Sequence, residues 1–163
     1  MSEIEVYDNF LPDDAAKSIS DLLLSTNFPW FYHPFVAYSS AVEPKDYYFT
    51  HTFFSNHTIN SDHFYMLSPL LERVSARALV RCKANLYPNV DKIIENDVHR
   101  DWPFPHRGFV YYINTNNGYT GFENGLRVES IANRILLFDS STPHFSTSCT
   151  DEKVRVNINC NFF

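Results

Sequence analysis

The chain has 163 residues, a length that suits one domain with a sizeable hydrophobic core. Aromatic residues make up 17% of it, with 15 Phe and 10 Tyr, a composition that favours β-strands and bulky packing. The net charge of −6 argues against a broad basic surface for nucleic acid, and no apolar run approaches the length of a membrane span.

Two helices are predicted in the first half of the chain, among short strands and irregular segments. The first opens near Leu11, where apolar residues begin to follow helical spacing, and the second opens near Ser61, a favourable N-cap residue. Pro69 lies inside the second pattern and predicts either a kink or a division into two helices. Extended segments are expected at residues 4–7, at 51–54 and within the irregular, aromatic-rich stretch 28–48.

From residue 78 onward the pattern predicts almost only strands and turns. Tight turns are expected at Asn116-Asn117-Gly118 and at Glu123-Asn124-Gly125, and a loop rich in Ser, Thr and Pro then leads to His144. Strands are expected at 78–87, 108–113, 126–131, 135–138 and 154–162.

These elements predict a mainly β fold with N-terminal helices, in which the helices pack on one sheet of a jelly roll. Residues 1–163 are expected to form a single domain, with a helical and irregular part at 1–77 and a β core at 78–163. No internal repeat, linker or low-complexity tract interrupts the chain.

The last predicted strand has an unusual polar side. Apolar residues alternate with polar ones, which is typical of a half-buried strand. The polar positions hold one guanidinium and three amides, namely Arg155, Asn157, Asn159 and Asn161. An arginine fork suits a carboxylate, and such a charge-assisted pair contributes roughly 1.5–3 kcal/mol. A surface arginine on an edge strand is the alternative interpretation.

His99 and Asp101 are two residues apart, so on a strand both side chains point to one face while Arg100 turns away. His144, just after Pro143, can supply a third ligand to the same ion. Two imidazoles and one carboxylate on one face of an octahedron form the facial triad of non-haem Fe(II) oxygenases. A hairpin after His144 would bring Arg155 beside that ion.

Two further residues bear on this assignment. His106 is a rival third ligand. It is the weaker candidate because no strand that carries an arginine follows it as neatly as the strand of Arg155 follows His144. Asp97 shares the parity of the two predicted ligands, and its carboxylate is either a group that orients a ligand or a solvated loop residue.

Five segments together resemble one enzyme family: Ala84-Asn85-Leu86-Tyr87-Pro88, His99-Arg100-Asp101, Tyr112-Ile113-Asn114-Thr115-Asn116-Asn117-Gly118-Tyr119 with Gly121-Phe122-Glu123, His144, and Arg155-Val156-Asn157. The family is that of the 2-oxoglutarate/Fe(II)-dependent oxygenases. The chain is most similar to the prolyl 4-hydroxylase-like branch, which includes small phage-encoded members. The resemblance covers residues 78–163, about half the chain, and departs from the family where Asn157 stands in place of its usual serine.

The resemblance implies a double-stranded β-helix and a role for each matching residue. Fe(II) would be held by His99, Asp101 and His144, and ascorbate would serve as a reductant. The far carboxylate of 2-oxoglutarate would meet Arg155, with help from Tyr87 and Asn157, and O2 would be the second cosubstrate. The residues expected to line the active site are Trp102, Tyr111 and Asn85. Because Asp101 keeps the carboxylate that halogenating members lack, hydroxylation is expected.

The leading hypothesis is therefore a dioxygenase that hydroxylates an aliphatic carbon of a peptide or small molecule, with a prolyl-type peptidyl side chain as the favoured target. That target rests on fold-level analogy. One alternative is a non-catalytic jelly roll that binds or senses a metal or a small carboxylate. A third possibility is a zinc hydrolase, but the sequence has no glutamate placed beside the three ligands to act as a general base. A fourth is a nucleic-acid base oxygenase, which the net negative charge of the chain disfavours.

Three cysteines, Cys82, Cys149 and Cys160, show no paired spacing, so neither a disulfide framework nor a zinc knuckle is expected. Cys82 and Cys160 fall on apolar strand faces and are predicted to be small core residues. The N-terminus lacks a signal-peptide pattern. We therefore expect a cytoplasmic location, the host cytoplasm if the protein is phage-encoded, and no membrane partner.

Overall fold

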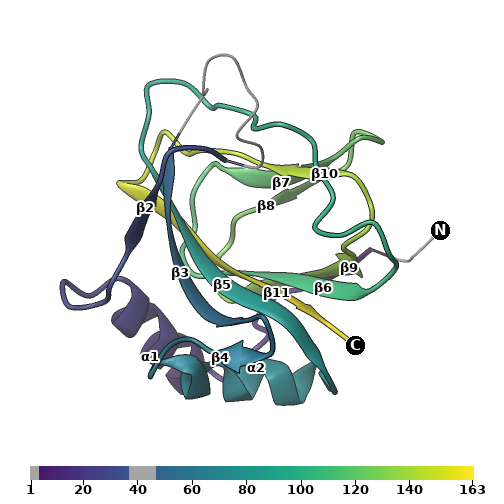
Figure 1. Ribbon diagram of the computed structural model, residues 1–163. Coiled ribbons are helices and arrows are strands. Elements are labelled where there is room, and N and C mark those ends of the chain that lie inside the picture. The colour runs from purple at the N-terminus through teal and green to yellow at the C-terminus, as the bar shows by residue number, and fades with distance from the viewer. Residues whose placement is uncertain (1–3, 37–46) are drawn as a thin grey trace.

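The computed structural model describes residues 4–36 and 47–163. A large antiparallel sheet and a small one lie face to face, and the helices cover the outer face of the large sheet (Figure 1). This arrangement confirms the predicted mainly β fold with helices packed on one sheet of a jelly roll.

The large sheet has eight strands, and the hydrogen-bonded order is β1-β9-β6-β11-β5-β3-β2, with β4 paired to β3. Its strands are β1 (Glu5–Tyr7), β2 (Phe31–His33), β3 (Tyr48–Ser55), β4 (Thr58–Ile59), β5 (Leu79–Pro88), β6 (Arg107–Tyr112), β9 (Arg134–Asp139) and β11 (Val154–Phe162). The small sheet has the order β10-β7-β8, made of β7 (Tyr119–Phe122), β8 (Arg127–Glu129) and β10 (His144–Ser146).

Both predicted helical regions are helical. Helix α1 (Asp13–Leu23) buries Ile19 and Leu23 against the large sheet. The second region is divided into a 3-10 turn, η1 (Phe64–Leu67), and helix α2 (Ser68–Arg73), which places Pro69 in the first turn of α2. That position suits proline because an amide hydrogen there has no partner within the helix. None of the helices in the described ranges has the length and apolarity needed to cross a bilayer.

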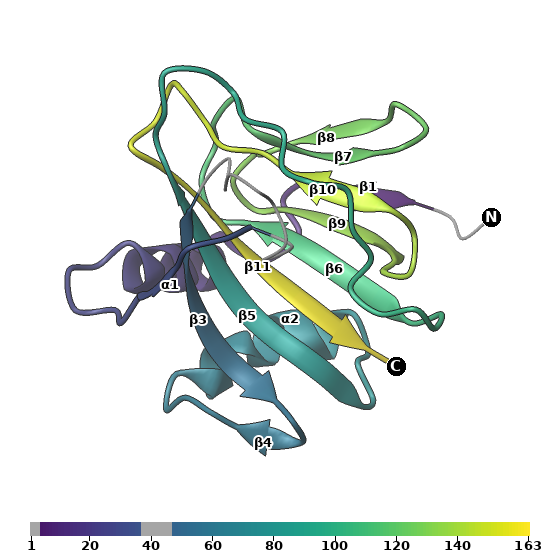
Figure 2. The same cartoon turned by 45° about the horizontal axis from the view of Figure 1, so that its top comes forward.

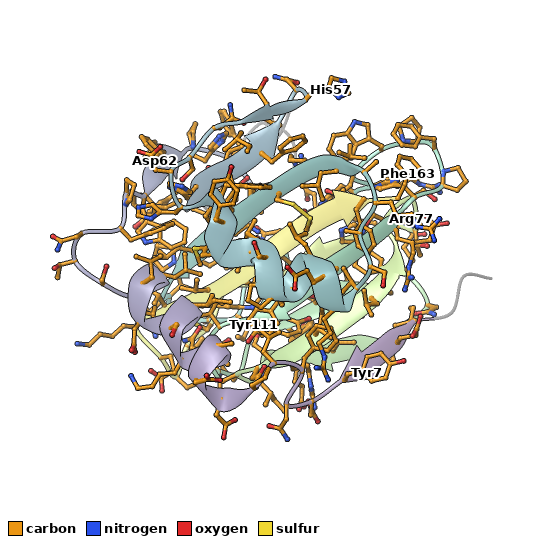
Figure 3. The ribbon with its side chains drawn as sticks, turned by 90° about the horizontal axis from the view of Figure 1, so that it is seen from below. Tyr7, His57, Asp62, Arg77, Tyr111 and Phe163 are labelled. Carbon is orange, nitrogen blue, oxygen red and sulfur yellow. A yellow bond between two sulfur atoms is a disulfide. The ribbon has the colours of Figure 1, made fainter. Side chains whose placement is uncertain are left out.

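The inner strands of the large sheet have two very different faces, although both are buried. On β5 and β11 the residues that face the helices are apolar, among them Ala84 and Ile158, and they belong to the main core. Seen from the helix side, Tyr111 lies on this same covered face (Figure 3). The opposite face, turned toward the small sheet, carries polar residues in register, including Arg155 opposite Tyr87 and Asn157 opposite Asn85.

The polar side of β11 corrects one prediction. A half-buried strand with one apolar face was expected, but the polar face is buried as well, since Arg155 and Asn161 are both 0% exposed. The reason is that the small sheet and the segment leading to His99 lie over this face (Figure 2). The guanidinium and the amides therefore form the lining of an interior space.

The connection after His144 corrects a second prediction. β10 pairs with β7 of the small sheet, whereas β11 pairs with β5 and β6 of the large sheet, so no hairpin joins His144 to Arg155. The two side chains instead reach the interior from opposite sheets. An intervening turn at residues 147–153 lets the chain cross from one layer to the other.

The cysteines correct a third prediction. Cys82 on β5 and Cys160 on β11 are buried in the core as expected, but they also form a disulfide, which was not expected. Their pairing depends on the register of β5 against β11, which places them directly opposite one another. Sequence spacing carries no information about that register. Cys149 is a buried free thiol.

Candidate metal centre

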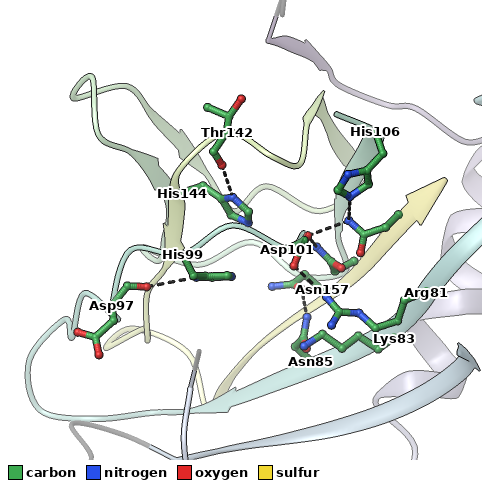
Figure 4. A network of polar contacts seen from close by, with 12 residues as sticks. Arg81, Lys83, Asn85, Asp97, His99, Asp101, His106, Thr142, His144 and Asn157 are labelled. Atoms are coloured by element: carbon green, nitrogen blue, oxygen red, sulfur yellow. Dashed lines mark hydrogen bonds and ion pairs between the residues drawn. The ribbon is translucent and has the colours of Figure 1, made fainter. Parts of the chain in front are cut away.

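The structure brings the three predicted metal ligands together. His99 and Asp101 lie on the extended segment after β5, and His144 begins β10. Reciprocal backbone hydrogen bonds join the two histidines: the His99 amide donates to the His144 carbonyl at 2.9 Å, and the reverse bond is 3.0 Å. One ligand atom from each of the three side chains lies within 4.8 Å of the others. Figure 4 shows the two rings and the carboxylate directed toward a common space.

Backbone carbonyls fix the orientation of both imidazole rings. Nδ1 of His144 lies 2.9 Å from the Thr142 carbonyl, and Nδ1 of His99 lies 3.2 Å from the Asp97 carbonyl. Each Nδ1 therefore donates its hydrogen to a carbonyl two residues earlier, and Nε2 is the nitrogen able to ligate a metal. Asp97 thus orients His99 through its main chain, whereas its carboxylate was the group considered from the sequence.

The environment keeps both imidazoles neutral. Burial, assisted by the nearby His144, lowers the pKa of His99 to about 4, and burial also lowers the pKa of His144. An imidazole whose pKa is lowered loses its proton below neutral pH, so both rings are uncharged at pH 7. Metal binding requires the uncharged imidazole, so this part of the site is ready to accept an ion.

Asp101 is held as a carboxylate by its neighbours. Burial on its own would raise the pKa of Asp101, but Arg81, His144 and Asn161 outweigh it and lower the pKa to about 2. The Arg81 guanidinium donates to Oδ1 at 2.8 Å, and the Asn161 amide donates to Oδ2 at 2.8 Å. Arg81 itself packs 4.6 Å over the ring of Trp102. These contacts fix the position of the carboxylate beside the two histidines.

The rival ligand, His106, does not join this cluster. Its Nδ1 lies 2.8 Å from the Phe104 carbonyl and its Nε2 lies 3.2 Å from the Asn161 amide nitrogen. Within residues 4–36 and 47–163, His99, Asp101 and His144 are the one group with the composition and spacing of a metal site. His144 is therefore the better third ligand.

The three ligands open into a cavity of about 530 Å³ between the two sheets. Its floor, called the cavity floor below, consists of inward-facing residues of β3, β5 and β11: Tyr48, Thr50, Thr52, Arg81, Lys83, Asn85, Tyr87, Asn157 and Asn159. Three predicted residues, Tyr87, Asn157 and Asn85, lie there. The Asn85 amide donates to the Asn157 oxygen at 2.9 Å (Figure 4).

Arg155 lies directly behind this lining. It is fully buried, and its guanidinium donates to Ser130 Oγ at 2.8 Å and to the Thr147 carbonyl at 3.2 Å. A longer contact of 3.5 Å reaches Thr120 Oγ1, which does line the cavity. No carboxylate of the described residues pairs with this guanidinium. A buried cation that lacks an anion is costly, so the arrangement suits an anionic ligand at this end of the cavity.

The remaining lining predictions have different outcomes. Tyr111 lies outside the cavity: it packs in the helix-covered core and donates to Asn133 at 2.9 Å. On β6 it is Val110 that lines the cavity, because its side chain points to the opposite face of the sheet from that of Tyr111. Trp102 borders an adjoining cavity of about 390 Å³, which His99 and Asp101 also line.

Sequence reasoning missed Arg81 and Lys83 as residues of the site. The signal that could have found them is parity, because both alternate with Cys82 and share the face of Tyr87 on the same strand. They were assigned only to one face of the strand expected at 78–87.

Asn161→Ala is expected to weaken metal binding without removing a ligand. The lost donor leaves one carboxylate oxygen of Asp101 without its hydrogen bond at 2.8 Å, and losses of supporting hydrogen bonds of this kind cost roughly 10–100-fold in metal affinity. Titration with Mn(II), followed by electron paramagnetic resonance, measures the change. Asn124→Ala on the exposed β7–β8 turn is the control, and equal affinities for the two variants would contradict the role of Asn161.

No protein-family model matches the chain, and no curated protein matches it in sequence. Solved structures do match in fold. A prolyl hydroxylase from Trichoplax adhaerens, in complex with a hypoxia inducible factor peptide fragment, has a TM-score of 0.69 at 15% identity, covering 98% of this chain and 83% of its own. A prolyl-4-hydroxylase from Pseudomonas putida has a TM-score of 0.67 at 13% identity, with coverage of 99% and 93%.

A viral collagen prolyl hydroxylase from Paramecium Bursaria Chlorella virus-1, in its 2OG complex, has a TM-score of 0.63 at 11% identity, covering 97% of this chain and 94% of its own. The three matches span nearly the whole of this chain. The fold is therefore the double-stranded β-helix of the 2-oxoglutarate/Fe(II) oxygenases, as predicted.

Proposed function

We propose that the chain is an Fe(II)- and 2-oxoglutarate-dependent dioxygenase that hydroxylates its substrate. One observation carries the proposal: two neutral imidazoles and a carboxylate converge at one end of a cavity that has a buried, carboxylate-free guanidinium behind it. The donor set fits Fe(II), and three ligands on one face leave the other positions for cosubstrate and oxygen. The fold, shared with known oxygenases, adds support.

In this proposal Arg155 receives the far carboxylate of 2-oxoglutarate, and Tyr87 and Asn157 assist. The Arg155 guanidinium lies 5.2 Å over the Tyr87 ring, and Asn157 lines the cavity between this end and the metal ligands. The bound iron, with 2-oxoglutarate and O2, would supply the oxidant that removes a hydrogen atom from substrate, and ascorbate would keep the iron reduced. The chain's part is to hold these groups in one cavity, the iron by His99, Asp101 and His144 and the cosubstrate by Arg155.

A peptidyl side chain, of the prolyl type, is the substrate we favour. The Trichoplax adhaerens enzyme of the same fold was solved with a peptide fragment. In this chain, His33 and Phe35 border the cavity beside β2, which is the last strand of the large sheet within the described ranges, and Phe31 and Tyr32 on that strand are each 61% exposed. An extended peptide could pair with such an edge strand and present one side chain to the metal. The expected phage origin and cytoplasmic location stay predictions.

The proposal is tested by succinate formation in the absence of substrate. Protein stripped of adventitious Ni or Zn, which bind more tightly than Fe(II), is supplied with Fe(II), ascorbate, 2-oxoglutarate and O2. Slow succinate formation is expected, and the same protein without O2 is the control. Cosubstrate binding without turnover would favour the sensing alternative, and loss of both binding and turnover would overturn the proposal.

A further inference from the structure

Lys83 adds to the cavity a cation distinct from Arg81 and Arg155. It lies on β5 opposite Asn159 and lines the cavity floor (Figure 4). Lys83 and Tyr87 are four residues apart on that strand, a separation of about 13 Å between their Cα atoms. The ammonium is therefore anchored nearer to Asp101 and Arg81 than to the Arg155 end of the cavity.

The Lys83 ammonium has little to neutralise it. Among the described residues, its one hydrogen bond is a long contact of 3.5 Å to the Tyr48 hydroxyl, and its Nζ lies 5.5 Å from the centre of the ring of this neutral residue. No carboxylate of the described ranges forms an ion pair with it, since the nearby Asp101 is paired with Arg81. Burial lowers the pKa of Lys83 to about 8, so the side chain is still mainly charged at pH 7. A methionine would fill this position without that electrostatic cost.

The cosubstrate does not account for this charge. Arg155 is fully buried and has no carboxylate partner among the described residues, so it has the stronger need for the far carboxylate of 2-oxoglutarate. Lys83 has less need of that carboxylate, because it is partly exposed to the cavity and its pKa is lowered to about 8. With Arg81 balancing Asp101, a cavity loaded with iron and the 2-oxoglutarate dianion keeps an excess of positive charge, and Lys83 is part of it.

The surroundings of Lys83 fit a carboxylate better than a phosphate. The register places it between Thr52 on β3 and Asn159 on β11, a hydroxyl and an amide beside a single ammonium, and the Asn159 amide makes only a long contact of 3.4 Å to Asp101. Phosphate sites in proteins gather arginines, helix N-termini or runs of backbone amides, and the nearest guanidinium, that of Arg81, is already bound to Asp101.

We propose that Lys83 is a substrate-binding residue and that the substrate carries a carboxylate next to the carbon that is oxidised. This inference rests on the proposed function, because it assumes that Arg155 and the metal take the cosubstrate. The carboxylate belongs either to an acidic residue beside the target of a peptide or to a small carboxylic acid, and both present the same group to the ammonium.

The test compares charged and neutral probes on the Mn(II)- and 2-oxoglutarate-loaded protein without O2. The small probes are propionate and propionamide, and the peptide probes are acetyl-Ala-Pro-Glu-Gly-amide and its Gln counterpart. Saturation transfer from protein to probe measures binding, and Mn(II)-induced relaxation of probe protons measures closeness to the metal. The variants are Lys83→Met and Lys83→Gln, with Lys17→Met as a matched control that removes an exposed lysine from α1.

We expect the charged probe of each pair to bind more tightly, and both Lys83 variants to lose about tenfold of that preference, the scale of one charge-assisted hydrogen bond. Lys17→Met should retain the preference, and 2-oxoglutarate affinity should be unchanged in every variant. Tighter binding of the Glu peptide than of propionate would identify a peptide substrate, and the reverse order would identify a small acid.

Four results would overturn the inference. The first is equal binding of charged and neutral probes, and the second is a charge preference that survives in both Lys83 variants. The third is tighter binding of methylphosphonate than of propionate, and the fourth is a large loss of 2-oxoglutarate affinity in Lys83→Met, which would assign Lys83 to the cosubstrate. Saturation transfer is repeated on metal-free protein without 2-oxoglutarate. This measurement tests Lys83 even if metal or cosubstrate does not bind. Failure of the metal or the cosubstrate to bind would count against the proposed function and not against the role of Lys83.

Discussion

His144→Ala should abolish specific binding of Fe(II), and with it all succinate formation. His144 supplies one of only two imidazoles in the cluster, and its ring is fixed by the Thr142 carbonyl at 2.9 Å. The two ligands that remain, His99 and Asp101, lie on one short segment and cannot complete a face of the octahedron. Calorimetric titration with Mn(II), a redox-stable substitute, measures the loss directly.

His106→Ala is the matched control for that variant. His106 is also buried, with 5% exposure against 4% for His144, and it too donates to a backbone carbonyl two residues earlier. It lies outside the cluster of ligand atoms. His106→Ala should therefore bind Mn(II), and thermal unfolding of both variants shows whether each is folded. Full metal affinity in His144→Ala, or its loss in His106→Ala alone, would show that the third ligand is misassigned.

Substitution of Asp101 is also expected to lower the stability of the fold, an effect that substitution of the histidines does not share. Arg81 donates to its carboxylate at 2.8 Å, and the two partners are largely buried, with side-chain exposures of 26% and 5%. Removing one partner of such a pair leaves the other uncompensated. A loss of activity in Asp101→Ala would thus mix two effects, and for this reason His144 is the sharper position at which to test the metal site.

The sequence allowed the metal ligands to be predicted because their chemistry is local. A two-residue spacing puts His99 and Asp101 on one face in any extended segment, whatever packs around it. The alternation of β11 likewise identified Arg155 and Asn157 as a group. What alternation could not give was the environment of that face, since a solvated face and the lining of an interior cavity have the same period.

The features that could not be predicted from the sequence depend on how the strands are aligned with one another and on which elements pack against each face of the large sheet. Lys83 became part of the cavity because β5 and β11 pair with Asn159 opposite it, and the same register joins Cys82 to Cys160. The chain also crosses from one sheet to the other between β10 and β11, where a hairpin was expected, and this connection is determined by tertiary packing. A short turn is compatible with both connections, so the local pattern did not distinguish them.

Arg155→Met is expected to remove most of the affinity for 2-oxoglutarate while leaving metal affinity nearly intact. Among the residues that the structure describes, the guanidinium is the one fully buried cation behind the cavity, and a charge-assisted pair with the far carboxylate contributes about 2–3 kcal/mol, or roughly 30–150-fold in affinity. Its distance from the ligand cluster along the floor explains why metal binding should persist. Displacement of 2-oxoglutarate from the Mn(II)-loaded protein measures the change.

The variant also tests whether the buried charge is there for a ligand or for the fold. Ser130 and Thr147 accept hydrogen bonds from Arg155, so methionine leaves them without a donor and should lower the stability of the unliganded protein. A ligand that binds only the folded state raises stability by an amount that grows with the logarithm of the ratio of its concentration to its dissociation constant. With Mn(II) present, 2-oxoglutarate should therefore raise the melting temperature of the wild type and of Arg127→Met, an exposed control, by much more than that of Arg155→Met. Equal shifts in all three would mean that Arg155 serves the fold alone and that the cosubstrate's far carboxylate is bound elsewhere in the cavity.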